Sequence, residues 1–396
     1  MEELARESIS LLASASSKQP PDVGPRLGSM GAVFIMLKSA LGAGLLNFPW
    51  AFDRAGGVHS AVTVELISLV FLISGLIILG YSSSISGQLT YQAVVKELCG
   101  NAIGQLCEIC FVLSLFMISV AFLIIVNDQL EKLCDTLYEL VTTTSKSEMP
   151  YHFYTDHQFA LVLLCVFLIT PLSISKAISI QKYTRLTSSW ASMFSVIPTI
   201  CFGFQCHEAS IAIYSSMENQ RLSHWALISV VTMVICLLIY SLTGAYGYLT
   251  FGKAVDPDIL MSYSTHDKLM LVARLLFGVS IITIYPIIVL LGRSVIQDPL
   301  LSWWRRRGGG LLAKFESRSR YVLTVLWITT TLLIAVFVPD ISKVISVIGG
   351  ISAFFIFIFP GRDIALTIWG IVTLICGAFI FGQSITIAVM ELLGKI

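Results

Sequence analysis

Charged residues are scarce in this chain. Asp, Glu, Lys and Arg make up 12% of its 396 residues, whereas 56% are apolar. A soluble domain carries about twice that share of charge, so a soluble globular protein is excluded. The net charge of +1 also gives no basic excess for binding nucleic acid. We therefore expect an all-α, multi-pass membrane protein that contacts the lipid bilayer and has no nucleic-acid partner.

The residue patterns of intramembrane enzymes are missing too. The apolar segments contain no serine and histidine pair, no paired aspartates and no histidine-rich cluster. The nine cysteines lie mostly in apolar segments, where a thiol behaves as a small hydrophobe. The i,i+3 pair Cys107 and Cys110 has no second pair or nearby histidine to complete a metal site. We expect no enzyme, no cofactor and no metal centre formed by these residues.

Residues 1–29 are polar and contain acidic residues, and they lack the apolar core of a cleavable signal. We expect a disordered cytoplasmic tail there and a transmembrane domain over 30–396. A membrane span needs about 20 apolar residues. Nine segments meet this rule: 30–52, 59–80, 104–126, 191–216, 225–249, 270–291, 321–338, 342–360 and 365–390. A tenth candidate, Gln158–Ser173, is shorter and could be a re-entrant or interfacial segment.

Charge placement gives a topology that conflicts with ten spans. The segment 293–320 carries seven Lys or Arg residues and should be cytoplasmic, whereas 127–157 has six acidic residues against two lysines and should be external. If Gln158–Ser173 crosses the membrane, 293–320 falls outside. Either this segment does not cross, or a whole helix is absent between Thr184 and Trp190 relative to an ancestral design. We favour the loss of a helix as the origin of the conflict, with the failure of Gln158–Ser173 to cross as one possible consequence.

Two apolar segments are interrupted by glycine, proline and polar residues, at 42–49 and 197–205. Non-helical backbone at bilayer depth is tolerated only where protein, water or a solute satisfies its N–H and C=O groups. A matched pair of such breaks is the best sequence indication of a transporter's binding site.

Several ordered motifs resemble the sodium-coupled neutral amino acid transporters of solute carrier family 38. The motifs lie at 30–34, 41–49, 181–184, 198–207, 348–350 and 359–361. The resemblance implies an amino acid/auxin permease fold, a LeuT/APC-like inverted repeat of eleven helices whose first and sixth helices are unwound at the substrate. Here we expect nine or ten, with 30–190 an incomplete first repeat lacking the fifth helix, 191–360 the second repeat and 365–390 the last helix.

The function implied by this resemblance is secondary active transport of neutral amino acids such as glutamine and alanine. The coupling ion is Na⁺ or H⁺, and the family default is a plasma-membrane protein; we expect a monomer. The alternative is a transport-incompetent shortened isoform with a regulatory role or none, because the fifth helix is missing.

The site must bind one carboxylate and one ammonium group. We predict that the amides of Gly42, Ala43 and Gly44 bind the carboxylate at the N-terminus of the outer half-helix. Carbonyls around Cys201–Gly203 would accept from the ammonium. The alternative for the glycines is a packing face or a simple kink.

Residues after the second break supply further candidates. Phe202 or Phe204 could close over the substrate, and Gln205 could hydrogen-bond a side-chain amide, although aromatic residues beside a break are often plain packing. His207 and Glu208 could relay protons or simply line an aqueous vestibule.

Ion coupling is predicted from three residues. Lys38 lies about 12 Å along the first helix, where an unpartnered ammonium costs at least about 2.5 kcal/mol. By the resemblance, many relatives carry at this position an asparagine associated with Na⁺. We expect Lys38 to replace a cation or to pair with Glu65, with snorkelling to the cytoplasmic face as the alternative. Ser280 and Thr283, in 270–291, could coordinate Na⁺ or hydrogen-bond their own helix.

Overall fold

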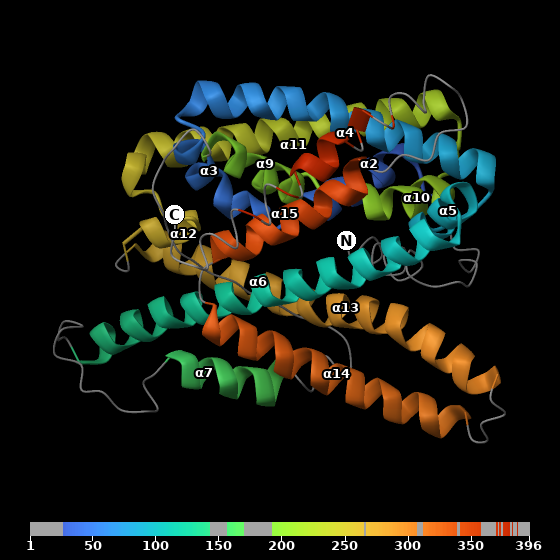
Figure 1. The fold of residues 1–396 in the computed structure, drawn as a ribbon. Helices are drawn as coiled ribbons and strands as arrows, with labels where there is room; N and C mark the ends of the chain where they lie inside the picture. The colour runs from blue at the N-terminus through green and yellow to red at the C-terminus, as the bar shows by residue number, and fades with distance from the viewer. Residues whose placement is uncertain are drawn as a thin grey trace. The chain divides into compact units, whose positions relative to one another are not determined.

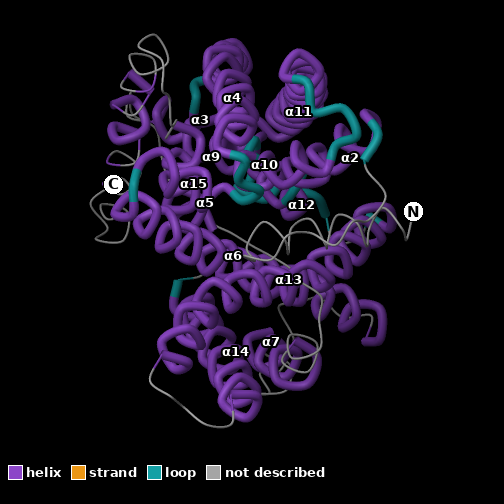
Figure 2. The backbone as a smooth tube through the Cα atoms, turned by 90° about the vertical axis from the view of Figure 1, so that its right-hand side faces the viewer, coloured by secondary structure: helices purple, strands orange, loops and turns teal. Residues whose placement is uncertain are grey.

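The computed structural model describes most of the chain, and the described part is helical (Figure 2). The chain divides into two compact units, one of residues 1–114, 186–255 and 345–396 and the other of residues 115–185 and 256–344. The described residues are 27–142, 157–169, 192–264, 267–306, 312–338, 341–357, 370, 372–373, 375–380, 382 and 386.

The first unit contains both segments that the sequence predicts to be broken. Its helices α4 and α11 lie side by side (Figure 1), and α11 also contacts α2 and α3. The elements are α2 (Ser29–Ala40), η1 (Ala43–Asn47), α3 (Phe48–Arg54), α4 (Val58–Ser86), α5 (Tyr91–Cys99), the first part of α6 (Asn101–Thr142), α9 (Ser192–Gly203), α10 (His207–Ser216), α11 (Leu222–Phe251), η4 (Gly252–Ala254) and most of α15 (Ile341–Phe357).

The second unit contains the remainder of α6 and a pair of long helices that pack together, α13 and α14. Its other elements are short. Trp327 of α14 donates its indole N–H to Ser119 Oγ of α6 at 3.1 Å, so a polar contact joins α14 to α6. The elements are α6 from Leu115, α7 (His157–Leu164), the π-helix η3 (Cys165–Ile169), α12 (Ile259–Ser262), α13 (Lys268–Arg306) and α14 (Leu312–Phe337).

Long apolar helices confirm a multi-pass membrane protein. By length and composition, six described helices can cross a membrane, or seven if the bent pair α2 and α3 counts as one span. They occur where the sequence predicts spans, and α15 adds a shorter apolar helix over 341–353. The predicted last helix, 365–390, lies mostly outside the described residues. The tail before residue 27, which the sequence predicts to be disordered, also lies outside the described residues. So does the region 184–190, where the sequence predicts that a helix has been lost.

The first broken segment bends by 54° between α2 and α3. Helix α2 ends at Ala40, and the next two residues, Leu41 and Gly42, have extended backbone before η1 begins. Pro49 lies in the first turn of α3, where its missing N–H leaves no intrahelical bond unmade. The α-helix is therefore interrupted over residues 41–47, close to the predicted interruption at 42–49, and Phe48 and Pro49 already belong to α3.

The second broken segment resembles the first in plan. Helix α9 contains Pro198 and ends at Gly203, and α10 begins at His207 after three non-helical residues. The predicted interruption at 197–205 is thus confirmed, although the helix continues through Pro198 and breaks at Phe204.

The two broken segments run antiparallel. Leu27, just before α2, exchanges backbone hydrogen bonds with the end of α10: its N–H donates to the carbonyl oxygen of Ser216 at 2.9 Å, and its own carbonyl oxygen accepts from the N–H of Glu218 at 3.0 Å. If each broken segment crosses the membrane once, the first segment ends on the same side of the membrane on which the second begins. The chain between Arg54 and Ser192 must therefore cross the membrane an even number of times. Helices α4 and α6 supply two crossings. The described helix over 157–169 is about 20 Å long, which favours the prediction that Gln158–Ser173 does not cross alone.

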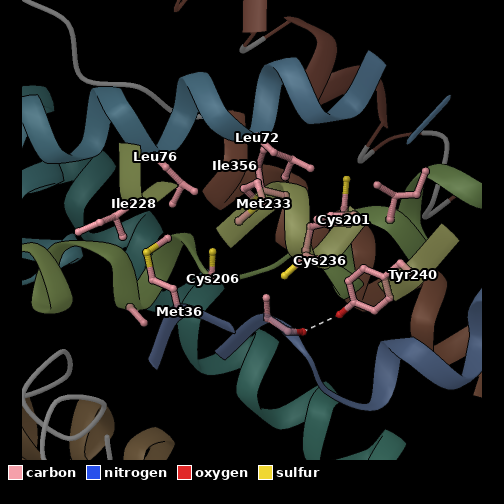
Figure 3. Close-up of a cluster of buried hydrophobic side chains, with 14 of the residues drawn as sticks. Met36, Leu72, Leu76, Cys201, Cys206, Ile228, Met233, Cys236, Tyr240 and Ile356 are labelled. Carbon is pink, nitrogen blue, oxygen red and sulfur yellow. Dashed lines mark hydrogen bonds between the residues drawn. The ribbon is translucent and has the colours of Figure 1, made fainter. Parts of the chain in front are cut away.

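An apolar core holds the first unit together (Figure 3), and it includes Met36, Leu72, Ile228, Met233 and Ile356. Trp225 of α11 is fully buried, and its indole N–H donates to the carbonyl oxygen of Leu76 in α4 at 2.7 Å. Gly80 leaves the space that the Trp225 ring occupies. The core therefore fixes α4 and α11 beside the two breaks.

Candidate functional site

The two breaks contact each other through glycine backbone. A Cβ atom added to Gly44 would lie 2.8 Å from the Cα atom of Gly203, and one added to Gly203 would lie 2.7 Å from Cε2 of Phe48. The first contact is with backbone and the second with the ring of buried Phe48, and real Cβ atoms do not come this close to their neighbours, so a side chain at either position would force the segments apart. The sequence prediction that Gly44 and Gly203 belong to one site is consistent with this contact.

A tyrosine hydroxyl links the two breaks. Tyr240 of α11 is fully buried and lies in the apolar cluster of Figure 3. Its Oη lies 2.7 Å from the carbonyl oxygen of Ala40 and 2.7 Å from that of Gly203. These carbonyls are the last of α2 and of α9. The carbonyl ends of both half-helices therefore converge on one hydroxyl group.

Aromatic packing holds that hydroxyl in place. The Tyr240 ring stacks on Phe48 with centroids 4.2 Å apart and planes 8° from parallel, and it contacts the Phe204 ring at 4.8 Å. Phe204 is fully buried in this cluster. It therefore serves as packing at the break, one of the two roles that the sequence leaves open, whereas Phe202 is half-buried.

A buried pair of polar side chains joins η1, which follows the first break, to α9, which precedes the second break. Thr199 of α9 donates its hydroxyl to Asn47 Oδ1 of η1 at 2.9 Å, and both side chains are buried. Cys201, two residues further along, is also buried. A hydrogen bond in such surroundings is costly to break, so this pair fixes η1 against α9.

Gln205 lies at the centre of a short polar chain. Its amide oxygen accepts from Ser352 Oγ of α15, and its amide nitrogen donates to Glu208 Oε1. Ser352 Oγ also lies 2.8 Å from the carbonyl oxygen of Ile348, so its one proton has two alternative acceptors. Both ends of the Gln205 amide are thus oriented by protein groups.

His207 is fully buried at the start of α10. Its Nε2 lies 3.0 Å from the carbonyl oxygen of Leu72, while Nδ1 has no hydrogen-bond partner in the described part of the chain. Glu208 lies in the first turn of α10, where the helix dipole stabilises a carboxylate.

Lys38 lies in the last turn of α2, and its side chain is exposed. Glu65 of α4 is fully buried, and Oε2 accepts a hydrogen bond from Ser241 of α11. Within the described residues, Glu65 Oε1 has no hydrogen-bond partner. The pairing of Lys38 with Glu65 stays a prediction.

The predicted Na⁺ ligands Ser280 and Thr283 lie on α13 of the second unit. Their side chains are outside the described part of the structure, so their role also stays a prediction.

A nearly apolar cavity of about 460 Å³ lies beside the second break. Cys201 and Leu72 line it, and Ser68 supplies the one hydroxyl among the lining residues. Such walls cannot satisfy an ammonium and a carboxylate, so this cavity is not the place where a zwitterion's charged groups bind.

The breaks supply both kinds of backbone group that a zwitterion needs. The last carbonyls of α2 and α9 have no intrahelical partner and carry partial negative charge. The first amides of η1, which begins at Ala43, carry partial positive charge. Gly42, the N-cap of η1, is exposed.

Comparison with known proteins identifies the family. The family model "Transmembrane amino acid transporter protein" matches residues 26–189 and 152–362. The chain belongs to this family. Within it, the chain belongs to solute carrier family 38: it is 51% identical to human "Solute carrier family 38 member 8" over 427 aligned positions, covering 94% of this chain and 96% of the human protein.

Other members of solute carrier family 38 are also similar to this chain over nearly its whole length. The mouse protein of the same name is 50% identical over 94% of this chain and 96% of its own length. "Sodium-coupled neutral amino acid transporter 7" of Danio rerio is 39% identical over 96% and 91%. The resemblance read from the motifs is therefore confirmed, and with it a family of amino acid transporters in which no enzymatic chemistry is required.

The family alignments are longer than the chain. The 427 positions aligned with the human protein exceed the 396 residues here, so the human protein has residues without a counterpart in this chain. One family-model match ends at residue 189, within the region 184–190 where the sequence places the missing helix.

Sequence reasoning missed Tyr240, Asn47 and Thr199. The signal for Tyr240 was a phenolic hydroxyl within a long apolar helix, because a buried hydroxyl at bilayer depth needs a partner. The signal for Asn47 was an amide in an apolar segment next to the break.

Proposed function

We propose that this chain is a secondary active transporter of neutral amino acids such as glutamine and alanine, coupled to Na⁺ or H⁺. The observation that carries the proposal is the contact between the two breaks at Gly44 and Gly203, beside the converging carbonyls of Ala40 and Gly203. The names of the relatives, which include sodium-coupled neutral amino acid transporters, support the substrate class.

The amino acid binds with its ammonium at the carbonyl ends of α2 and α9 and its carboxylate at the first amides of η1. The glycines allow the backbone to approach the ligand closely. Gln205, oriented by Ser352 and Glu208, is placed to contact the substrate side chain.

Transport proceeds by alternating access in a LeuT/APC-like inverted repeat. The antiparallel course of the two broken segments supports this arrangement. Lys38, Ser280 and Thr283 are the proposed ion-coupling residues. We propose a monomer in the plasma membrane as the working form.

A second candidate function is a shortened, non-transporting isoform that associates with full-length partners or has no role. It is favoured by the residues that the human relative has in addition to this chain. Loss of a helix from the first repeat would remove packing that alternating access needs.

The proposed site is tested by ligand binding to the purified full chain. Ligands that bind only the folded state stabilise it by RT ln(1 + [L]/Kd), so the melting temperature rises with ligand concentration and with affinity. We expect L-alanine to stabilise the protein, whereas propionate, which lacks the ammonium, and ethylamine, which lacks the carboxylate, do not. Equal stabilisation by all three compounds would contradict a site that recognises both charged groups.

A further inference from the structure

The Tyr240 hydroxyl has one proton and two acceptors. The carbonyl oxygens of Ala40 and Gly203 each lie 2.7 Å from Oη, and a phenol can donate only one hydrogen bond. At any moment one of the two carbonyls therefore lacks the proton of this hydroxyl.

The two acceptor carbonyls are stronger hydrogen-bond acceptors than carbonyls within a helix. Each is the last carbonyl of a half-helix, where the helix dipole concentrates negative charge. Tyr240 is fully buried, so solvent water does not hydrogen-bond to its hydroxyl. A group with several N–H donors and a positive charge satisfies both carbonyls better than one neutral hydroxyl does.

We propose that the Tyr240 hydroxyl competes with the substrate's ammonium for these two carbonyls. In the protein without substrate, the hydroxyl bridges the breaks and keeps α2 and α9 together. When an amino acid binds, its ammonium donates to both carbonyls, and the hydroxyl loses the one hydrogen bond that it donates. This inference rests on the proposed function, and it makes Tyr240 a positioning residue that sets substrate affinity.

If the hydroxyl competes with the substrate, removing it should make substrate binding tighter, which a purely structural role does not predict. Tyr240→Phe keeps the ring that stacks on Phe48 and contacts Phe204 but removes the donor. The substrate no longer displaces a hydrogen bond, so binding becomes tighter, by about fivefold for one typical hydrogen bond. A hydroxyl that contacted the substrate directly would give weaker binding on removal.

The matched control is Tyr91→Phe. Tyr91 of α5 is also buried, and its hydroxyl donates to one backbone carbonyl, that of Phe355, at 3.1 Å. Both substitutions remove one buried hydroxyl, but only Tyr240 bridges the two breaks. Any general loss of stability should therefore appear in both variants.

The experiment measures apparent affinities for L-glutamine and L-alanine by thermal stabilisation of the purified full chain. We expect about fivefold tighter binding for Tyr240→Phe and unchanged binding for Tyr91→Phe. Unchanged or weaker binding in Tyr240→Phe, with the unaltered protein binding normally, overturns the competition and leaves the proposed function intact. No stabilisation of the unaltered protein by either amino acid overturns both.

A second variant covers the case in which Tyr240→Phe does not fold. Incorporation of 3-fluorotyrosine at position 240 keeps the ring and the hydroxyl and makes the hydroxyl a stronger donor. Competition then predicts weaker amino acid binding, and tighter or unchanged binding would contradict it.

Discussion

Gly44 and Gly203 touch backbone to backbone, so a methyl group on Gly44 would lie 2.8 Å from the Cα atom of Gly203. We expect Gly44→Ala to push the two breaks apart and to weaken amino acid binding tenfold or more, because overpacking against backbone typically costs about 1–3 kcal/mol. The measurement is the apparent affinity for L-glutamine by thermal stabilisation. Gly28→Ala is the control, since a Cβ there meets nothing within 4 Å. Equal effects of the two substitutions would show that the contact has no special role.

Thr199→Val should loosen η1 from α9. The substitution keeps the shape of the side chain and removes the donor to Asn47 Oδ1, which should lower stability by about 1–3 kcal/mol in a buried setting. The apparent melting temperature of the purified protein measures the loss. Thr199→Ser retains the hydroxyl and should recover most of it, and a Thr199→Ser protein as unstable as Thr199→Val would disprove the importance of this hydrogen bond.

Gln205→Ala should distinguish side chains of the substrate. If the amide of Gln205 contacts the substrate's own amide, affinity for L-glutamine should fall about tenfold, as for loss of one hydrogen bond to a buried partner, while affinity for L-alanine changes little. Ser352→Ala, which removes the donor to Gln205 Oε1, should shift affinities in the same direction by less. A parallel loss for both amino acids would mean that Gln205 acts only on the backbone of the break.

Lys38→Asn should alter ion coupling. If the Lys38 ammonium stands where a cation would bind, its removal should make L-glutamine uptake more dependent on Na⁺, measured as the ratio of uptake in NaCl to uptake in choline chloride. Lys38→Arg keeps the charge and serves as the control. The coupling role would be refuted by a Lys38→Asn protein whose uptake and Na⁺ response both match the original.

Much of this architecture could be predicted from local sequence. Glycine, proline and polar residues clustered within apolar segments located both breaks, because such clusters weaken a helix and supply polar groups that can satisfy an unwound backbone. The structure moved the second break only from Pro198 to Phe204, since α9 accommodates its proline. Long apolar segments likewise predicted the crossing helices.

Tertiary pairings could not be predicted in this way. Tyr240 lies 200 residues from Ala40 and 37 from Gly203 along the chain, and nothing local marks it as the link between them. The Thr199 and Asn47 pair spans 152 residues. Such contacts arise from how helices pack, which one sequence without its fold does not specify.

Uptake of radiolabelled L-glutamine and L-alanine by this chain, at a verified cell surface, tests the central claim most directly. It should be measured with Na⁺, with choline in its place and at two external pH values, beside human solute carrier family 38 member 8 as a full-length comparison. We predict saturable uptake that responds to Na⁺ or to pH. Surface expression without uptake by this chain, when the full-length relative transports, would contradict the account and support a non-transporting shortened form.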